Sequence, residues 1–342
     1  MSKPRLKRKP VSLALQGGGA HGTFTWGVLD KILEDGRLEI EAISGTSAGA
    51  MNAVVLADGW VKDKADGARE ALENFWREVS RAAHGSPLKR NPMDVFLGNW
   101  SLDNSAGYIF FDLLSRLVSP YDVNPLNINP VRDLLARTID FDRVQECQEI
   151  KIIVSATNVH TGRVRVFECA ELTPDAVMAS ACIPFIFQAV EIEGVPYWDG
   201  GYMGNPALFP FFDPSQTNDI IIVQINPIER LETPTSARDI LNRVNEITFN
   251  ASLMRELRAI NFVGRLLDEG QLDPSRYKHV LVHRIHPDGE MNDLQASSKL
   301  NTEWTFFLHL RDLGREAAEV WLDKNFDDIG KRSTENIRAL FE

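Results

Sequence analysis

Two strand–turn–helix units follow one another at the start of the sequence. In the first, the apolar run 11–15 leads into consecutive glycines and then into a helical pattern over 23–34. In the second, the run 39–44 leads into a glycine-bounded turn and a helix of small apolar residues over 50–57. Because parallel strands are joined by helical crossovers, this alternation predicts an α/β fold with a mainly parallel central sheet.

The same kinds of signal continue along the chain. Strands are expected at 151–156, 164–169, 190–197, 219–226 and 279–285, and helices at 68–81, 174–182, 237–267 and 301–324. The length of 342 residues suits one large α/β unit or two modest domains. Helical signals dominate over 235–342, which we expect to be a C-terminal extension packed on the preceding part.

The overall charge excludes one large class of function. The chain has 37 Lys and Arg residues against 48 Asp and Glu residues, a formal net charge of −11. Nucleic-acid binding requires clustered positive charge, so we expect no nucleic-acid partner. The basic residues that do cluster lie within 1–10, which we expect to be a disordered tail. Docking of this tail to an anionic lipid surface is the alternative.

The sequence predicts neither a disulfide framework nor a membrane span. Cys147, Cys169 and Cys182 are too few for such a framework and fit a reducing compartment. The apolar run 11–15 is shorter than the roughly 7–15 residues of a signal-peptide core. No apolar stretch approaches the roughly 18–20 residues of a transmembrane helix. We therefore expect a cytoplasmic protein that can associate peripherally with membranes.

The second glycine turn has the G-x-S-x-G pattern of a nucleophile elbow. It reads Gly45-Thr46-Ser47-Ala48-Gly49 and lies between a predicted strand and a predicted helix. In such an elbow the residues around the serine are small, and the hydroxyl stands above the strand ends at the N-terminus of the helix. Ser47 is therefore the candidate nucleophile. A tight turn whose serine caps a helix is the alternative.

The first glycine turn, 17–22, contains Gly17, Gly18 and Gly19 and also fits the dinucleotide fingerprint G-x-G-x-x-G. That fingerprint needs an acidic residue near the end of the next strand, whereas this strand has its acidic residues at the beginning. Backbone amides at a helix N-terminus can equally hold an oxyanion. Beside a candidate serine, the turn therefore favours acyl transfer over nucleotide binding.

A candidate general base follows the hairpin expected over 190–197. Asp199-Gly200-Gly201 places a carboxylate next to two residues without side chains, so the carboxylate can approach another loop closely. Alone, this sequence is an ordinary turn. A serine hydroxyl becomes a good nucleophile only when a base accepts its proton, so Asp199 is a candidate base for Ser47.

Four ordered blocks of the sequence resemble those of the patatin-like phospholipases. They are GGGAHG at 17–22, GTSAG at 45–49, ASACIP at 179–184 and DGG at 199–201. The resemblance spans about 11–226 and implies a three-layer α/β/α fold. We accordingly expect a patatin-like catalytic domain over 11–234, between the tail and the C-terminal extension.

The resemblance also implies the roles of the site residues. It implies a Ser–Asp dyad, with Ser47 as the nucleophile and Asp199 as its base. It further implies that the amides of Gly17, Gly18 and Gly19 form the oxyanion hole. No metal and no organic cofactor are implied.

The histidines raise two alternatives to a metal-free dyad. His21 and His160 are the histidines best placed in the sequence to complete a serine triad. Many family members have Arg or Lys where His21 stands, and His21 would supply the same charge only when protonated. His279, His283 and His286 could imitate a metal cluster, but no acidic residue joins them at ligand spacing, so we expect structural roles.

The segment 85–130 is too aromatic for a linker and too rich in Pro, Asn and Gly for a regular layer. It is expected to be a lid or interfacial patch, or else a packed accessory subdomain. The sequence as a whole predicts a serine acyl hydrolase acting on phospholipids, lysophospholipids or related lipid esters. An esterase or depolymerase acting on other acyl esters, and a non-catalytic lipid- or protein-binding module, are the alternatives.

Overall fold

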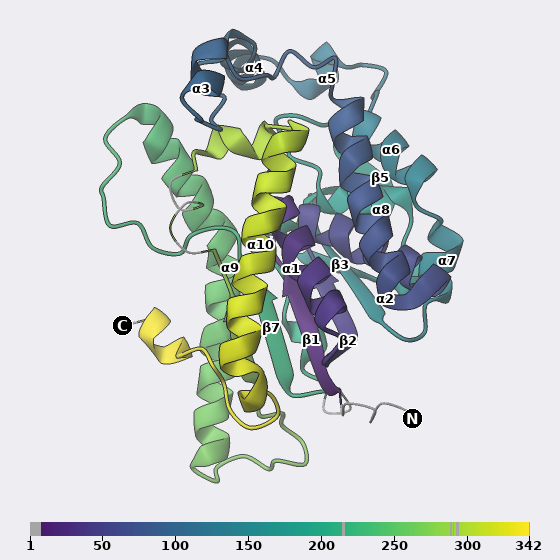
Figure 1. Ribbon diagram of the computed structural model, residues 1–342, viewed down its shortest axis with the longest axis vertical. Coiled ribbons are helices and arrows are strands. Elements are labelled where there is room, and N and C mark those ends of the chain that lie inside the picture. The colour runs from purple at the N-terminus through teal and green to yellow at the C-terminus, as the bar shows by residue number, and fades with distance from the viewer. Residues whose placement is uncertain (1–7, 214–215, 288, 290, 292–293, 342) are drawn as a thin grey trace.

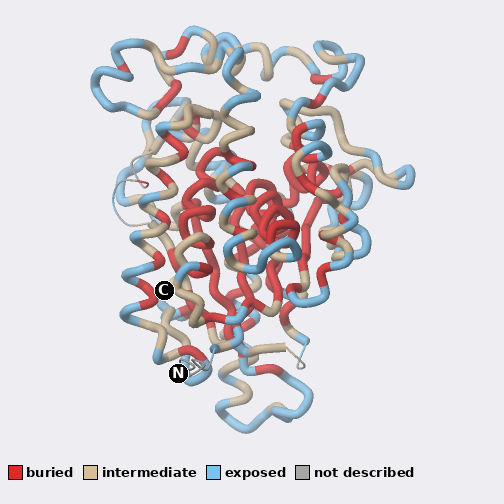
Figure 2. Tube along the Cα trace, turned by 45° about the vertical axis from the view of Figure 1, so that its right-hand side comes forward, coloured by how far each residue is buried: buried red, intermediate tan, exposed pale blue. Residues whose placement is uncertain are grey.

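Helices cover both faces of a single central sheet (Figure 1). The computed structural model describes residues 8–213, 216–287, 289, 291 and 294–341. Its layers are helix, sheet and helix, with the most deeply buried residues along the middle of the molecule (Figure 2). The predicted three-layer α/β/α fold is confirmed.

The strands pair in an order that differs from their order in the sequence. Their bounds are β1 (Lys9–Leu15), β2 (Leu38–Gly45), β3 (Lys151–Asn158), β4 (Val164–Glu168), β5 (Val190–Ile192), β6 (Val195–Asp199), β7 (Asp219–Val223) and β8 (Leu281–Ile285). The sheet order is β5-β6-β3-β2-β1-β7-β8, and β4 pairs with β3. Strands β3, β2, β1, β7 and β8 run parallel, whereas β4, β5 and β6 pair antiparallel. Leu15 at the end of β1 is opposite Gly45 at the end of β2, so the two glycine turns come together.

Long helices flank the sheet, and shorter ones connect the strands. The helices are α1 (Gly22–Asp35), α2 (Ala48–Ala82), α3 (Pro92–Phe96), α4 (Ala106–Leu117), α5 (Pro120–Val123), α6 (Pro130–Thr138), α7 (Phe141–Glu146), α8 (Pro174–Ser180), α9 (Ala237–Asp268) and α10 (Trp304–Asn325). The 3-10 turns are η1 (Gly19–His21), η2 (Cys169–Glu171), η3 (Gly200–Tyr202), η4 (Phe209–Phe211), η6 (Ala296–Leu300), η7 (Phe326–Asp328) and η8 (Ile337–Leu340). Within the described residues, no helix combines the length and apolarity needed to cross a bilayer.

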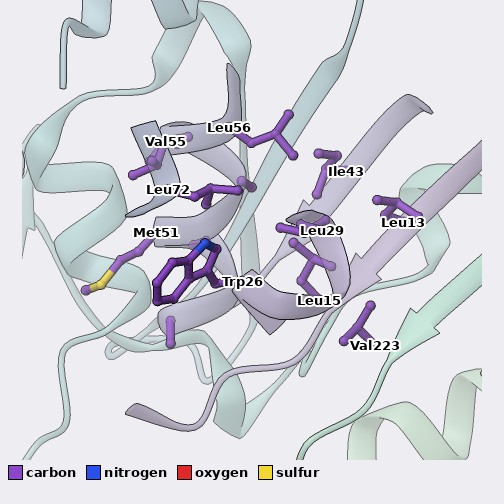
Figure 3. Packing of buried hydrophobic residues seen from close by; sticks show 14 of the residues in the cluster. Leu13, Leu15, Trp26, Leu29, Ile43, Met51, Val55, Leu56, Leu72 and Val223 are labelled. Atoms are coloured by element: carbon purple, nitrogen blue, oxygen red, sulfur yellow. The ribbon is translucent and has the colours of Figure 1, made fainter. Parts of the chain in front are cut away.

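Successive residues of the central strands enter two different cores. Leu13 and Ile43 point into the larger core, where α1, α2 and α10 pack; Figure 3 shows these side chains with Trp26. Ala14 and Ala42 point into the smaller core, which α9 and η8 cover. Strands buried on both faces of a parallel sheet are expected to be continuously apolar, and the central strands of this sheet fit that pattern.

Helix α2 joins two segments that the sequence predicted as separate helices at 50–57 and 68–81. Its backbone leaves the helical region at Asp63 (φ −152°, ψ 44°) and Lys64 (φ 47°, ψ −130°). The two predicted helices therefore correspond to the two arms of α2 on either side of this kink.

The segment after residue 235 is built into the sheet and into the larger core. β8 pairs with β7, and α10 packs along α1. The two helices are in backbone contact, because a Cβ at Gly314 would lie 2.0 Å from the carbonyl oxygen of Phe24. Phe306 and Leu310 of α10 are completely buried. This segment therefore shares one hydrophobic core with the N-terminal half.

The basic tail predicted over 1–10 is wrong at its C-terminal boundary. Lys9 and Pro10 are the first residues of β1, where pairing with β2 orders them. The Nζ of Lys9 also donates a 2.8 Å hydrogen bond to the carbonyl oxygen of Phe326. Residues 1–7 of the predicted tail lie outside the described part of the chain.

Residues 85–130 form what we call the cap segment, which lies at the top of the molecule in Figure 1 and contains α3, α4 and α5. In Figure 2 this part of the chain is mostly exposed or intermediate. Its exposed large apolar side chains are Met93, Val95, Phe96, Leu97, Ile109, Phe110, Leu113, Leu117, Tyr121, Val123, Leu126 and Ile128. The cap segment therefore presents an apolar surface outward.

Candidate active site

Ser47 lies in the turn between the end of β2 and the start of α2. Its backbone angles are φ 54° and ψ −120°, a conformation that residues other than glycine rarely adopt. The turn is closed tightly, because a Cβ at Gly45 would lie 2.5 Å from the carbonyl oxygen of Gly49. A Cβ at Gly49 would lie 2.3 Å from that of Leu15. This is the geometry that a nucleophile elbow requires.

The third sequence block supports the backbone of this turn. The amide of Ser47 donates a hydrogen bond of 2.9 Å to the hydroxyl of Ser180, the last residue of α8. The hydroxyl of Thr46 donates to the carbonyl oxygen of Gly204 at 2.6 Å. Both supports are buried, so the Ser47 backbone is fixed from two sides. Ser180 lies within the ASACIP block, but no local pattern in the sequence indicates its role.

Asp199 reaches the same place from the antiparallel side of the sheet. It is the last residue of β6 and is opposite Ala156 of β3. Its Oδ1 accepts a 2.7 Å hydrogen bond from the amide of Gly201, and the Ser47 hydroxyl lies within hydrogen-bonding reach of the same carboxylate. The structure thus brings together the serine and the aspartate, which are far apart in the sequence.

Burial controls the protonation of Asp199. The side chain is 1% exposed, and the lost hydration of its charged form raises the pKa to about 7. The hydrogen bonds from Gly201 and Ser47 oppose this rise in pKa. A carboxylate with a pKa near neutrality can both accept a proton from a hydroxyl and return it, as general acid–base catalysis requires.

The amides of the first glycine turn are not equivalent. The amide of Gly17 donates a 2.7 Å hydrogen bond to Oδ1 of the buried Asn205, so this amide is not available to an oxyanion. For the amides of Gly18 and Gly19, the described residues provide no hydrogen-bond acceptor. The expectation that all three amides form an oxyanion hole therefore needs a correction: Gly18 and Gly19 are the available donors.

Buried amide side chains hold the glycine turn from behind. Oε1 of Gln16 accepts hydrogen bonds from the backbone amides of Ile225 and Asn226, at 3.0 and 2.9 Å. Nε2 of Gln16 donates to Oδ1 of Asn250 on α9 at 3.0 Å. Nothing in the local pattern of these residues distinguishes them from ordinary polar residues, so the sequence did not predict their role. The paired ends of β1 and β7 bring Gln16 close to Asn226, and α9 adds Asn250.

The His21 side chain has its partners in the C-terminal part of the chain. Its Nε2 lies 2.8 Å from the hydroxyl of Ser298 in η6, and its ring meets that of Phe306 edge to face. Burial, and secondarily the charge of Lys299, lower the pKa of His21 well below the usual value. His21 is therefore neutral near pH 7 and supplies no positive charge to the glycine turn. His160 lies exposed in the turn between β3 and β4.

The later histidines have separate partners. His283 meets Asp219 at 2.9 Å and the hydroxyl of Thr334 at 3.0 Å, deep between β7 and β8. His279 meets Asp268 at 3.1 Å near the surface. No cluster of three or more His, Cys, Asp or Glu side chains suited to a metal ion occurs in the described ranges.

The sequence blocks that form the glycine turns and the dyad are also found by comparison with known protein families. The sequence matches the family described as Patatin-like phospholipase over residues 13–212, more than half of the chain. The chain belongs to the patatin-like phospholipase family. All four sequence blocks of this patatin-like phospholipase lie inside the matched residues, whereas β7, β8, α9 and α10 lie beyond them.

Similar solved structures include two bacterial proteins. VipD from Legionella pneumophila aligns with a TM-score of 0.43 and 17% identity, over 93% of this chain and 67% of VipD. ExoU from Pseudomonas aeruginosa, in a structure with SpcU, aligns with a TM-score of 0.36 and 17% identity, over 93% of this chain and 53% of that chain. This patatin-like phospholipase thus spans about half the length of the ExoU chain. No curated protein matches the sequence.

Proposed function

We propose that this member of a lipid acyl hydrolase family cleaves fatty-acyl esters of phospholipids or lysophospholipids through a dyad of Ser47 and Asp199. The observation that carries the proposal is the position of the Ser47 hydroxyl, in a strained elbow and within reach of a carboxylate whose pKa is raised to about 7. A hydroxyl beside such a base is an activated nucleophile. The family membership supports the same reaction class.

The reaction proceeds in two matched halves. Oγ of Ser47 attacks the ester carbonyl carbon as its proton passes to Asp199, and the carbonyl oxygen takes up the negative charge. The amides of Gly18 and Gly19 stabilise that oxyanion. The bond to the leaving alcohol then breaks, and the alcohol takes the proton from Asp199. Water then attacks the acyl-serine as its proton passes to Asp199. The acyl–Oγ bond breaks, Oγ of Ser47 takes the proton from Asp199, and the fatty acid is released.

The placement of the cap segment supports a lipid as substrate. Within the cap segment, the amide of Leu102 donates to the hydroxyl of Ser297 in η6 at 3.1 Å, and the following residue of η6, Ser298, meets His21 of the glycine turn. Near the C-terminal end of the cap segment, the carbonyl oxygen of Asn124 accepts a 2.6 Å hydrogen bond from Nε2 of Gln188, which follows the ASACIP block. The cap segment therefore bridges two loops of the site, and its apolar side chains face outward, where a lipid surface can meet them.

Hydrolysis by matched variants tests the proposal. Fatty-acid release from phosphatidylcholine vesicles and from lysophosphatidylcholine is measured for the wild type, Ser47→Ala and Asp199→Asn. We expect both variants to lose at least about 10³-fold in turnover, since nucleophile and base act as one unit. Turnover close to wild type in both variants would refute the dyad, and loss in Asp199→Asn alone would require another nucleophile.

Two further measurements separate the alternative functions. A series of chromogenic esters of increasing chain length distinguishes a lipid hydrolase from an esterase or depolymerase that prefers short or polymeric esters. Labelling with a fluorophosphonate distinguishes both from a non-catalytic binding module. We expect Ser47 to react covalently, whereas a site without an activated hydroxyl would remain unlabelled.

A further inference from the structure

A continuous chain of hydrogen bonds behind the glycine turn ends at a lysine. Nζ of Lys299, in η6, donates to Oδ1 of Asn226 at 2.7 Å. Nδ2 of Asn226 donates in turn to the carbonyl oxygen of Gly17 at 2.8 Å. Asn226 is buried, so water does not compete for its amide. The reaction described above makes no use of this chain.

The last link of the chain leads to an oxyanion donor. The carbonyl of Gly17 and the amide of Gly18 belong to the same peptide unit. When a peptide carbonyl accepts a hydrogen bond, its N–H becomes more positive and a stronger donor, and the effect is cooperative along a chain of bonds. The Gly18 amide is one of the two that the proposed reaction directs at the oxyanion.

Lys299 is also held against the turn by backbone contact. Gly19 has φ +58°, and a Cβ there would lie 2.5 Å from the carbonyl oxygen of Lys299. The neighbouring Ser298 meets His21 at 2.8 Å. The two contacts place the backbone of η6 against the turn, and from there the Lys299 side chain reaches Asn226.

The glycine turn 17–22 carries no charged side chain of its own. His21 is the only titratable residue of the segment 17–22, and it is neutral. Burial lowers the pKa of Lys299, whereas the nearby carboxylate of Glu246 favours its charged form. Glu246 is itself paired with Arg230 at 2.6 Å. The positive charge of Arg230 lowers the pKa of Lys299, opposing the effect of Glu246.

We propose that Lys299 is a positioning residue, which acts through Asn226 on the Gly17–Gly18 peptide and strengthens the Gly18 amide as an oxyanion donor. This inference rests on the proposed function. It adds a residue from outside the segment that matches the family, 13–212. Lys299 thereby supplies from the C-terminal part the positive charge that His21 does not provide.

Steady-state kinetics on a soluble chromogenic ester provide the first test. Lys299→Met removes the donor and the charge but keeps an unbranched side chain. We expect kcat to fall about tenfold with KM unchanged, less than the loss of a direct oxyanion donor. Lys299→Arg should recover most of kcat. In an Asn226→Ala background, Lys299→Met should have little further effect, because both residues act in one chain.

A spectroscopic test does not depend on turnover. In protein labelled with ¹⁵N-glycine, the amide proton of Gly18 should shift upfield in Lys299→Met, because a less polarised N–H is more shielded. An unchanged Gly18 resonance, or an unchanged kcat in an active enzyme, would overturn the proposal. If the wild type does not hydrolyse esters but Lys299→Met still shifts the Gly18 resonance, the result would support the chain of hydrogen bonds and reject the hydrolase function.

A matched variant controls for the loss of any enclosed lysine. Nζ of Lys278 donates to the carbonyl oxygen of Phe211 at 2.7 Å, close to the start of β8 and away from the carboxyl ends of the strands. Lys278→Met should lower the melting temperature without changing kcat or the Gly18 resonance. The same loss of kcat in both lysine variants would show a general effect on folding and contradict the positioning role.

Discussion

The amide nitrogen of Ser47 donates a 2.9 Å hydrogen bond to the hydroxyl oxygen of Ser180, a residue 133 positions further along the chain. The contact gives the third sequence block a physical role. The strained backbone of Ser47 leaves its amide without a helical partner at the start of α2, and the hydroxyl of Ser180 accepts a hydrogen bond from it. The elbow therefore depends on α8 as well as on its own glycines.

Removing this acceptor should impair catalysis more than folding. In Ser180→Ala the Ser47 amide would be buried without a partner, which costs about 1–3 kcal/mol of stability. We expect kcat to fall about 10- to 100-fold as the hydroxyl of Ser47 loses its position. Ser12→Ala is the control, because the buried Ser12 hydroxyl has no hydrogen-bond partner within the described structure. Equal kcat values for both variants would show that the Ser180 contact is dispensable.

The pH dependence of activity should follow Asp199. The base must be deprotonated to accept the Ser47 proton, and burial raises its pKa to about 7. We therefore expect kcat/KM to rise tenfold per pH unit in the acid range and to level off above a midpoint of about 7. A rate profile of the free enzyme on a soluble ester measures this midpoint, and a plateau that already begins near pH 5 would contradict it.

The same carboxylate should make stability depend on pH in the opposite direction from a salt-bridged aspartate. Its folded-state pKa lies above the unfolded value, so the folded state binds more protons and is destabilised as the pH rises from about 4 to above 7. Asp199→Asn removes this effect. Its melting temperature should exceed that of the wild type at pH 8 by more than at pH 5, as thermal unfolding at the two pH values would show.

The elbow should not tolerate even one added methyl group. In Gly49→Ala the new Cβ would lie 2.3 Å from the carbonyl oxygen of Leu15, a backbone atom at the end of the central strand β1. We expect a loss of about 2–4 kcal/mol in the free energy of unfolding, or failure to fold. Gly85→Ala serves as the control, because a Cβ at Gly85 meets no atom within 4 Å. Denaturant titration compares the two, and a change below about 1 kcal/mol in Gly49→Ala would contradict the packing described.

Activity on vesicles should depend on the apolar face of α4. Phe110 and Leu117 are 66% and 73% exposed, although a helix of a soluble protein normally turns such residues inward. Replacing both with Gln should reduce vesicle hydrolysis about 5- to 20-fold and leave hydrolysis of a soluble ester unchanged, because less apolar area would enter the lipid interface. Val320→Gln is the control, because it changes an exposed apolar residue of α10 outside the cap segment and should leave vesicle hydrolysis unchanged. Hydrogen exchange should show protection of the cap segment on vesicle binding; unchanged protection would refute the interfacial role.

A chelator should leave the reaction intact. The proposed steps use only the Ser47 hydroxyl, the Asp199 carboxylate and backbone amides, so nothing in them needs calcium. We expect equal initial rates on lysophosphatidylcholine with and without an excess of EDTA. Loss of activity in EDTA and its recovery on adding calcium would show that another group carries the reaction.

The fold was largely predictable, because the spacing of apolar residues along the sequence indicated most of its strands and helices. Apolar runs marked the central strands, and periodic apolar residues marked α1, α9 and α10, with bounds that differ from the structure by a few residues. Two features were not predictable locally. Lys9 belongs to β1 and its side chain contacts the distant Phe326. The two arms of α2 meet at a kink where the backbones of Gly59 and Gly67 come together, a contact between arms that the local pattern does not show.

The motif residues of the site were predictable, but their support was not. Ser47 and Asp199 stood out because each is flanked by glycines at a strand end. Asn205, Asn226 and Lys299 lie in segments without such a signal, and they act only because distant segments converge on the glycine turn. For the same reason the sequence could not show that the amide of Gly17, unlike those of Gly18 and Gly19, donates a hydrogen bond to the Asn205 side chain.

The contact of η6 with the glycine turn has a genetic consequence. Every recognisable motif of this chain is translated before residue 213, yet β8 and the turn carrying Lys299 follow much later. A nonsense mutation after β7 but before β8, between codons 224 and 280, would therefore yield a product that retains the full family signature but lacks β8 and the backing of its oxyanion donors.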